Sequence, residues 1–267
     1  MSTNILATIV AHKLKEVAAR KNEITIAQLE AMPLFAKKVL SLRSNLVDPN
    51  KTGIIAEFKR QSPSKGVINN TALVSKVAKA YSDLGASGIS VLTDAHFFGG
   101  TLDDLTTAVK NITPVLRKEF IIDEFQIIEA KAYGAAVILL IASCLTPKET
   151  KFLAGTAKKI GMEVLLEIHD ATEMEHIVDE VDFVGVNNRS LKSFEVNIEH
   201  SLELRSQLPK NKLSIAESGI YDLATFQLLK KEGFDGFLMG EYFMKQEDPS
   251  KAFELFVSQI KSNSNGI

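Results

Sequence analysis

The segment GIIAEFKRQSPSKG, residues 53–66, ends an apolar run with alternating charges and then breaks into serine and proline. Successive side chains of a strand point to opposite faces, so Glu57 and Lys59 share one face while Phe58 takes the other. A strand that runs into solvent with an ion pair at its tip would explain this pattern. The alternative is that both charges face a site, and the residues that end the other apolar runs decide between the two interpretations.

Lysine, glutamate and amide side chains recur at the ends of seven apolar runs of the chain. Where such groups converge in a water-poor place, desolvation and unlike neighbours shift their pKa values, as is typical of groups that donate and remove protons. Because this clustering is costly for stability alone, it favours a site for acid and base chemistry. The residues are Glu57 with Lys59, Asp94, Lys118, Glu167, Asn187 with Arg189, Glu217 with Ser218, and Gly240 with Glu241.

The last two of these positions also contain glycines, in Glu217-Ser218-Gly219 and Met239-Gly240-Glu241. Glycine lets backbone N–H groups approach phosphate oxygens. Either segment taken alone, however, is also explained by a simple turn that needs glycine. Their paired placement predicts a phosphate site. The side chains that could close over it are Ser62, Ser64 and Lys65.

The elements that must position these residues repeat from residue 53 onward as an apolar run followed by an amphipathic stretch of helical period. The runs begin at residues 54, 88, 114, 135, 162, 182, 213 and 236, and they resemble parallel strands buried on both faces. Eight such units predict an α/β fold, a (β/α)8 TIM barrel. A doubly wound sheet is the alternative, but no GxGxxG follows the first strand. In a barrel, the ends of the strands meet at one mouth, so Glu57 and Lys59 would face inward.

Residues 1–50 lie outside this repeat. We expect them to form an N-terminal helical extension that packs on the barrel of residues 51–267, so that the two parts make one structural domain. Residues 26–42, IAQLEAMPLFAKKVLSL, read as a helix with an interruption at Pro33. Their apolar face either caps the barrel or covers the substrate mouth.

Composition excludes several functional classes. The formal charge of −2, from 31 basic and 33 acidic residues, gives no overall attraction to nucleic acid or to an anionic membrane. The single cysteine, Cys144, fits a reducing compartment and reads as a small buried thiol in preference to a nucleophile. No apolar stretch reaches about 18 residues and no signal peptide is evident, so we expect a soluble, cytoplasmic protein.

Metal binding is not predicted, because the five histidines show no HxH or HExxH pairing and no cysteine cluster exists. His169 reads as the entry to a helix, and His176 and His200 as residues of helix surfaces. None of the three is expected to be catalytic.

Seven segments together resemble the indole-3-glycerol-phosphate synthase family of tryptophan biosynthesis, and the resemblance covers practically the whole chain. They are IIAEFKRQSPSKG, SVLTDAHFFGG, PVLRKEFIIDEFQIIEA, LLEIHD, VGVNNRSLKSFEV, AESGI and LMGEYFM. The resemblance implies a carboxy-lyase that closes 1-(2-carboxyphenylamino)-1-deoxyribulose 5-phosphate to an indole with loss of carbon dioxide and water. The iminium formed on ring closure accepts the electrons of the leaving carboxylate, so no cofactor is implied. Glu119 stands where the family commonly has aspartate.

The resemblance also implies roles for individual residues. Lys118 is the general acid of ring closure, Glu167 the general base, and Lys59 a second acid held by Glu57. Asn187 and Glu217 orient the substrate hydroxyls and the lysines. For substrate binding, Arg189 is expected to bind the anthranilate carboxylate. Phe98 and Phe120 are expected to flank the aromatic ring, unless they only pack in the core. The residues expected to bind phosphate are Ser62, Ser218, Gly219, Gly240 and Glu241, the last through its N–H group.

Two other functions fit the same residues. A Schiff-base aldolase also uses a desolvated lysine beside a phosphate loop, and a barrel that only binds a phosphorylated ligand would keep affinity without turnover. In each case the partner is a phosphorylated small molecule and neither nucleic acid nor membrane. Contacts with other tryptophan-pathway enzymes are a further expectation.

Overall fold

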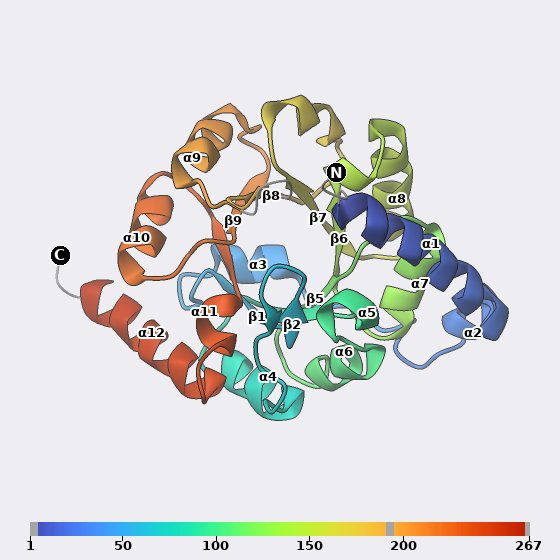
Figure 1. Ribbon diagram of the computed structural model, residues 1–267, viewed down its shortest axis with the longest axis horizontal. Helices are drawn as coiled ribbons and strands as arrows, with labels where there is room; N and C mark the ends of the chain where they lie inside the picture. Colours follow the sequence, from blue (N-terminus) through green and yellow to red (C-terminus); the bar gives the residue numbers. More distant parts are fainter. Residues whose placement is uncertain (1–4, 191–194, 265–267) are drawn as a thin grey trace.

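A computed structural model describes residues 5–190 and 195–264 of the chain. Eight parallel strands close into a barrel in the spatial order β1-β10-β9-β8-β7-β6-β5-β4, which confirms the predicted fold class (Figure 1). Each strand falls within or at one of the eight predicted apolar runs. The strands are β1 Ile54–Phe58, β4 Gly88–Leu92, β5 Val115–Lys118, β6 Val137–Ile141, β7 Glu163–Ile168, β8 Phe183–Asn187, β9 Leu213–Glu217 and β10 Gly236–Met239.

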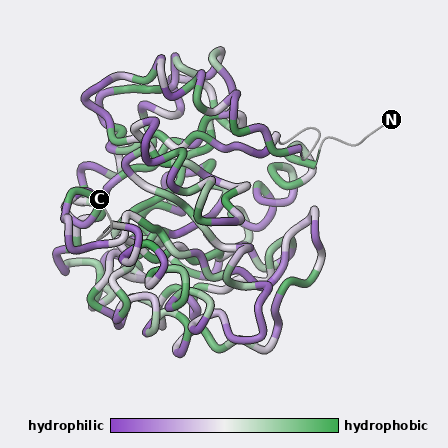
Figure 2. Tube along the Cα trace, turned by 90° about the vertical axis from the view of Figure 1, so that its left-hand side faces the viewer, coloured by the Kyte–Doolittle hydropathy of each residue, from purple (hydrophilic) through white to green (hydrophobic). Residues whose placement is uncertain are grey.

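Alternation along the strands creates two apolar layers. In β1, Ile54, Ala56 and Phe58 point outward to the helices, while Ile55 points into the barrel, where Leu165 of β7 and Ile215 of β9 also pack. Full burial of a side chain of this size contributes about 1.5–3 kcal/mol, so both layers stabilise the ring. Hydrophobic stretches accordingly run through the interior of the trace, and hydrophilic stretches occupy much of its outside (Figure 2).

Seven α-helices of seven or more residues surround the described strands of the barrel, with short helical turns between them. The unit after β7 has only a 3-10 turn, so the repeat is less regular there than the sequence predicts. The longer helices are α4 Val74–Asp83, α6 Leu102–Ala108, α7 Glu124–Ala132, α8 Pro147–Lys159, α9 Ile198–Gln207, α10 Leu223–Lys231 and α12 Pro249–Ser264. The short ones are α5 Ala95–Phe98, η1 Ala142–Cys144, η2 Ala171–His176 and α11 Glu241–Met244.

Local signals in the sequence explain where these helices begin and end. Helix α8 starts after Thr146, whose side chain accepts a hydrogen bond from the N–H of Glu149, with Pro147 in the first turn. The four glycines that precede strands at the predicted junctions all have positive φ, the conformation that ends a helix at little steric cost to glycine. They are Gly85, Gly134, Gly161 and Gly233.

Three helices precede the barrel: α1 Ile5–Glu23, α2 Ile26–Glu30 and α3 Leu42–Val47. The prediction for residues 26–42 is correct for the first helix and for the interruption at Pro33, because α2 ends at Glu30 and turns follow, but it is wrong for the residues after the proline, which are not helical. A new helix begins only after Ser41, whose side chain caps α3. The proline favours this break because it lacks the N–H group that a helix interior requires.

Of the two alternatives for residues 26–42, capping the barrel applies to the end of the segment at Ser41 and Leu42, whereas the mouth is covered by a helix outside the segment. Helix α3 lies across the end of the barrel where the strands begin, since Ser41 Oγ and Leu42 N donate to Glu163 at 2.6 and 2.7 Å. The side chain of Leu42 continues the apolar interior of the barrel, and α3 is seen across the middle of the ring in Figure 1. Helix α1 lies at the opposite end, where Ile5, Leu6 and Ile9 line the cavity at the mouth.

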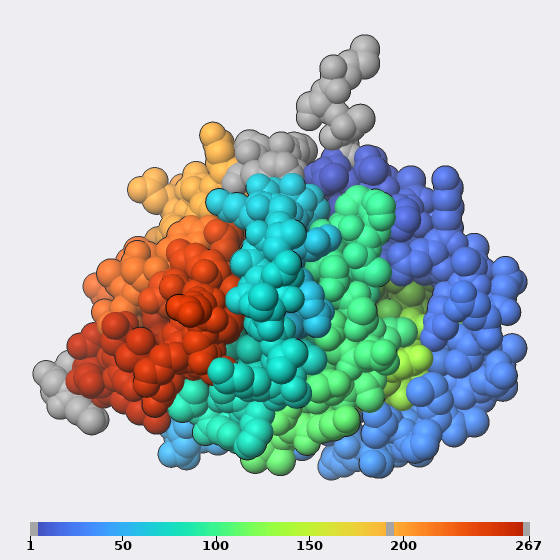
Figure 3. Space-filling model, turned by 60° about the horizontal axis from the view of Figure 1, so that its bottom comes forward, coloured from blue at the N-terminus to red at the C-terminus, as the bar shows by residue number. Residues whose placement is uncertain are grey.

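A short antiparallel hairpin, β2 Gln61–Ser62 and β3 Gly66–Val67, follows β1 and was not predicted. Figure 3 shows this part of the chain, in cyan, between the red C-terminal part and the green segment near residue 100. Arg60 donates to the carbonyl of Gly99 at 3.2 Å, and Asn69 Nδ2 donates to the carbonyl of Met244 at 3.0 Å. These hydrogen bonds fix the hairpin beside the mouth. None of the described helices is long and apolar enough to cross a membrane.

Candidate active site

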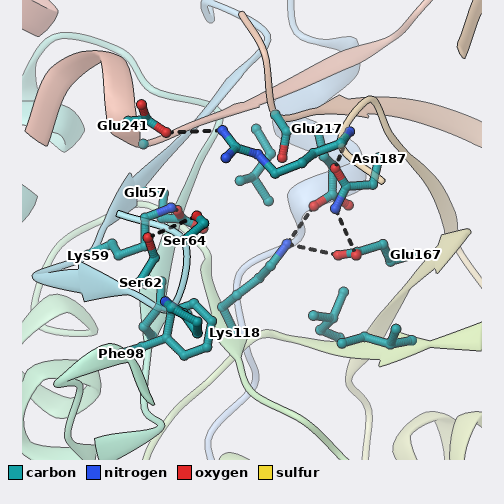
Figure 4. A pocket seen from close by; sticks show the side chains of 18 of the residues that line it. Glu57, Lys59, Ser62, Ser64, Phe98, Lys118, Glu167, Asn187, Glu217 and Glu241 are labelled. Atoms are coloured by element: carbon teal, nitrogen blue, oxygen red, sulfur yellow. Dashed lines mark hydrogen bonds and ion pairs between the residues drawn. The ribbon is translucent and has the colours of Figure 1, made fainter. Parts of the chain in front are cut away.

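One cavity opens at the end of the barrel where the strands finish, and every residue to which the family resemblance assigns a role lines it (Figure 4). Parallel strands of a closed ring direct their last inward side chains to this end, which explains the convergence. The predicted residues that line the cavity are Glu57, Lys59, Ser62, Phe98, Lys118, Phe120, Glu167, Asn187, Arg189, Glu217, Ser218, Gly219, Gly240 and Glu241.

Lys118, the last residue of β5, lies at the centre of the charged cluster. Its Nζ is 3.2 Å from Glu167 Oε2 and 2.5 Å from Glu217 Oε2, which come from β7 and β9 (Figure 4). Burial lowers the pKa of Lys118, but the negative charges of Glu217, Glu167 and Glu57 outweigh burial and leave the pKa above its ordinary value. The lysine is therefore protonated at neutral pH and can donate a proton.

The two carboxylates beside Lys118 differ in their pKa. Burial raises the pKa of Glu217 to about 7, with the negative charges of Glu167 and Glu57 adding to the effect and Lys118 opposing it. Burial acts on Glu167 in the same direction, but Lys118 and His169 outweigh it and bring the pKa of Glu167 below its ordinary value. Glu167 is thus the carboxylate that stays ionised, and Glu217 is the one that takes up a proton near neutrality.

Amide and glycine residues allow these carboxylates to pack closely. Asn187 Nδ2 donates to Glu167 Oε1 at 2.9 Å. A Cβ atom on Gly185 would lie 2.1 Å from Glu217 Oε1, and one on Gly240 would lie 2.6 Å from an oxygen of Glu57. Both glycines therefore serve close approach, since any larger residue would occupy the space of a catalytic carboxylate.

The charged pair that ends β1 faces the cavity as predicted. Lys59 Nζ donates to Glu57 Oε1 at 2.6 Å, and the lysine side chain is only 17% exposed. An ion pair at the tip of a strand in solvent would leave the lysine largely exposed. Glu57 and Lys59 therefore face the cavity and not open solvent.

Arg189 and the glycine loops line another part of the cavity. Arg189 Nη2 lies 3.1 Å from Glu241 Oε2 and 2.9 Å from the hydroxyl of Tyr221. Ser218 and Gly219 have φ of +65° and +71°, and Ser218 is the one non-glycine residue with positive φ in the described part of the chain. The turn is fixed by Asn188 Nδ2, which donates to the carbonyl of Ser218 at 2.7 Å.

Aromatic and hydroxyl side chains complete the lining. The rings of Phe98 and Phe120 are 6.0 Å apart between centroids, and Phe120 lies two residues after the end of β5. Ser62 and Ser64 lie together, with 3.4 Å between their hydroxyl oxygens. Lys65 is half-exposed and outside the lining, with its Nζ 3.8 Å from Glu241.

Asp94 does not belong to the mouth, although it ends a strand run as the other rim residues do. Its carboxylate is fully buried, caps α5 through the N–H of Phe97 and lies 2.9 Å from Lys13 Nζ of α1. The same lysine, 1% exposed, lies 3.0 Å from Glu119 Oε1. Helix α1 thus supplies the cation for two buried carboxylates at the ends of β4 and β5, a role that no sequence pattern indicated.

The histidines differ from expectation at two places. His176 is buried, not on a helix surface, and its Nδ1 lies 2.9 Å from Thr150 Oγ1. His200 is half-buried at the start of α9, where its Nε2 lies 2.9 Å from the carbonyl oxygen of His169. His169 does precede a helical turn, η2, but its ring also contacts the carboxylate of Glu167, which sequence reasoning missed.

The cysteine and the question of metal ions complete the description. Cys144 is half-buried in η1, and burial raises the pKa of its thiol to about 12. A thiol with so high a pKa is a poor nucleophile at neutral pH. In residues 5–190 and 195–264, no group of three or more histidine, cysteine, aspartate or glutamate side chains could hold a metal ion.

Comparisons with known proteins agree with this geometry. Among solved structures, the chain superimposes on tryptophan synthase subunit alpha from Legionella pneumophila with a TM-score of 0.62 and 15% identity, covering 85% of this chain and 98% of that one. A mandelate oxidase mutant gives a TM-score of 0.61 at 12% identity, covering 80% of this chain and 74% of that one. Identities this low show the barrel fold alone.

Sequence relatives carry the assignment further. A curated protein of Bacteroides thetaiotaomicron described as indole-3-glycerol phosphate synthase is 42% identical over 259 residues, which cover 97% of this chain and 99% of that protein. The family model described as indole-3-glycerol phosphate synthase matches residues 6–256, a range that takes in α1 and all eight strands. With the full set of expected mouth residues gathered in one cavity, the chain belongs to the indole-3-glycerol phosphate synthase family.

Proposed function

We propose how the residues of the mouth divide the work of this family's reaction. The enzyme is a carboxy-lyase of tryptophan biosynthesis that converts 1-(2-carboxyphenylamino)-1-deoxyribulose 5-phosphate into indole-3-glycerol phosphate, carbon dioxide and water. Ring closure joins the aromatic carbon that bears the carboxylate to the carbonyl carbon of the sugar. The carbonyl oxygen becomes negative as this bond forms, so a proton donor must lie beside it.

Lys118 is the general acid of ring closure. The proposal rests on one observation above the others: its ammonium lies between Glu167 and Glu217 at the centre of the cavity, buried and protonated. Uptake of a proton by Glu217 removes one negative charge from its side, which lowers the pKa of the lysine toward a range useful for an acid. Ring closure leaves an iminium nitrogen, which accepts the electron pair of the leaving carboxylate.

Dehydration then requires a base to remove a proton from the sugar carbon next to the nitrogen and an acid to release the hydroxyl group as water. Glu167 is the base, since it is the carboxylate that stays ionised beside Lys118. Lys59, held by Glu57 at 2.6 Å, is the second acid. Asn187 and Glu217 orient the hydroxyl groups and the lysines.

The ends of the substrate bind on different parts of the lining. The backbone N–H groups of Ser218, Gly219, Gly240 and Glu241, with the hydroxyl of Ser62, bind the phosphate, a role supported by the left-handed turn at 218–219. Arg189 binds the anthranilate carboxylate in place of Glu241. Phe98 and Phe120 flank the aromatic ring, which their position in the lining allows.

The test replaces the acid and the base separately. We expect Lys118→Met and Glu167→Gln each to lower turnover by at least about 10²-fold while the circular dichroism spectrum stays that of the wild type, because a lost acid or base typically costs this much. Turnover is followed by indole fluorescence with the carboxyphenylamino ribulose phosphate. Full activity of either variant would remove that residue from its role.

Borohydride addition to a reacting mixture separates this mechanism from a Schiff-base aldolase. Acid catalysis by Lys118 leaves no covalent adduct, whereas an imine on the lysine would be trapped. A barrel that only bound its ligand would show affinity without fluorescence of product.

Three further expectations remain proposals. Residues 1–50 and 51–267 form one structural domain, which the buried contacts of Lys13 with Asp94 and Glu119 support. Other tryptophan-pathway enzymes are proposed partners, testable by co-purification. A cytoplasmic location is proposed from the single cysteine and is testable by cell fractionation.

A further inference from the structure

His169 lies directly behind the proposed base without lining the cavity. Glu167 and His169 are two positions apart and therefore point to the same face of β7 and its extension. His169 Nε2 is 3.3 Å from Glu167 Oε1, and the histidine side chain is 11% exposed. Among the described residues, Nε2 has no aligned hydrogen bond, so the ring acts on this carboxylate through charge.

A second carboxylate holds the other side of the ring. Glu173 of η2 places Oε2 3.6 Å from His169 Nδ1 and accepts a hydrogen bond from the His169 N–H at 2.6 Å. Ser143 Oγ donates to the other oxygen of Glu173 at 2.5 Å, which fixes the carboxylate in place. His169 thus has a carboxylate near each ring nitrogen, with Ser143 Oγ also 3.4 Å from Nδ1, and the two negative charges favour the doubly protonated imidazolium.

The remaining charged groups near the ring point the same way. Burial lowers the pKa of His169, but Glu167 and Glu173 outweigh burial and raise it to about 10. His200 of α9 faces the backbone carbonyl of His169, not its ring. Groups that face the ring or its two carboxylates are Lys118 of β5, Cys144 of η1 and Asn187 of β8.

We propose that His169 is a positioning residue for Glu167: its imidazolium, fixed by Glu173, holds Oε1 of the base so that Oε2 faces Lys118 and the substrate. The inference rests on the proposed role of Glu167. Oε1 then receives both Asn187 and His169, and Oε2 keeps the contact with Lys118 at 3.2 Å. Oε1 is thereby held by other side chains of the protein, and Oε2 is left to react.

Removal of the imidazolium has two consequences for the base. The carboxylate loses one of its two cationic neighbours, so it takes up a proton at higher pH than in the wild type. It also loses a contact that restricts rotation about its side chain, so Oε2 spends less time in the reactive direction. Both effects act on turnover, and neither removes a contact with the bound substrate.

The first experiment compares His169→Phe, which keeps a ring without charge, with His169→Gln, which keeps a donor. We expect His169→Phe to lower kcat roughly 10- to 100-fold with little change in KM, since small displacements of a catalytic group cost about this much. The acid limb of its kcat/KM profile should move to higher pH, and His169→Gln should recover part of the rate. His12→Gln is the matched control and should behave as wild type, because His12 of α1 packs against His96 of α5 and lies outside the cavity lining.

The second experiment observes the wild-type ring itself and needs no variant of His169 that folds. In nitrogen-15 NMR spectra of the labelled protein at pH 8, both ring nitrogens of His169 should carry protons. Glu173→Gln should move the titration of the ring to lower pH. A neutral imidazole in the wild type at pH 7 would overturn the proposal, as would His169→Phe with unchanged kcat and an unshifted acid limb.

Glu167→Gln separates the two levels of the reasoning. If Glu167→Gln retains full activity, the base has been assigned to the wrong residue, whatever His169 does. If Glu167→Gln is slow while His169→Phe equals the wild type in rate and pH profile, the base stands and only the role of His169 falls.

Discussion

Gly185 provides a direct test of how tightly the site is packed. It lies in β8 beneath the carboxylate of Glu217, and a Cβ atom placed on it would be 2.1 Å from Glu217 Oε1 and 3.2 Å from Leu165 Cδ1. Its substitution by alanine adds one methyl group and no charge. The change therefore acts on the site only through the space that Glu217 occupies.

The size of the effect follows from these distances. Ordinary van der Waals contact begins near 3.4 Å, so the oxygen at 2.1 Å must move by about 1.3 Å to accommodate the methyl group. Because both oxygens belong to one planar carboxylate, movement of Oε1 also displaces Oε2, the atom that lies 2.5 Å from Lys118 Nζ. A misplacement on the order of 1 Å in a catalytic site costs roughly 10²-fold in rate, whereas overpacking costs about 1–3 kcal/mol of stability. We expect Gly185→Ala to lose about 10²-fold in kcat while remaining folded.

The assay is indole fluorescence at saturating substrate, together with thermal unfolding of each variant. Gly155→Ala is the matched control, because a Cβ atom on Gly155 of α8 meets nothing within 4 Å. That variant should retain full activity and gain stability by up to about 1 kcal/mol, since alanine is the better helix former. Glu217→Asp in the Gly185→Ala background shortens the displaced side chain and should recover part of the loss relative to the sum of the two single changes.

Full activity of Gly185→Ala would refute the reasoning, and so would a crystal structure of the variant with Glu217 still in contact with Lys118. Gly185→Ser is not a substitute for the alanine variant, because a larger side chain that prevented folding would leave the rate unmeasured. The crystal structure of the alanine variant, in which the displacement of Glu217 is measured directly, decides the matter independently of the rate.

Two further predictions concern stability. Lys13→Met leaves the buried carboxylate of Asp94 without its cation and leaves Glu119 with only Arg117, at 4.0 Å, so it should cost about 3–5 kcal/mol in urea unfolding. Lys15→Met, exposed on the same helix, should cost almost nothing, and equal unfolding of the two variants would contradict the buried pairing. Glu217 has a folded pKa of about 7, above its ordinary 4.5, so the folded state retains a proton that the unfolded state has lost, and this contribution to stability is present below pH 4.5 and disappears as pH rises through 7. The melting temperature of Glu217→Gln relative to wild type should therefore rise over that interval, and a constant difference would show that Glu217 titrates normally.

The barrel could be predicted because its signals are local and repeat. Eight apolar runs and four junction glycines mark where strands begin, and a closed ring then fixes the mouth without further information. The residues proposed for catalysis follow from the same rule, because they lie at or just past the final inward positions of the strands. The segment of residues 26–42 is helical only as far as Glu30, and the break at Pro33 is wider than expected, because no helix resumes before Leu42. The helix that begins there, α3, is held by a tertiary contact, since the N–H of Leu42 donates to Glu163, which helical periodicity does not reveal.

The sequence pattern does not mark the residues that support the site from behind. Lys13 is far from the barrel strands in sequence, and on a helix the pattern alone reads it as a surface charge. Asp94 ends a strand run like the rim residues, yet it turns to Lys13, because its oxygen is used to cap α5. Gly185 has no side chain, so no functional group predicts its role at the site. These roles arise from contacts between elements, which a single sequence does not specify.

His169, by contrast, was within reach of the rule that identified Lys59. On β1, the inward residue Glu57 is followed two positions later by Lys59, which donates to it. On β8, Arg189 likewise follows Asn187 by two positions, although there the bond to Oδ1 of Asn187 comes from the backbone N–H of Arg189 and not from its side chain. Because side chains on one face of a strand recur every second residue, the outer member of each pair lies next to the inner one and can hold it in place. The same step taken from Glu167 on β7 arrives at His169, whose ring contacts that carboxylate. The prediction that His169 enters the helix after the strand did not use this periodicity. The alternation of side chains nevertheless continues just past the end of a strand, until the chain turns.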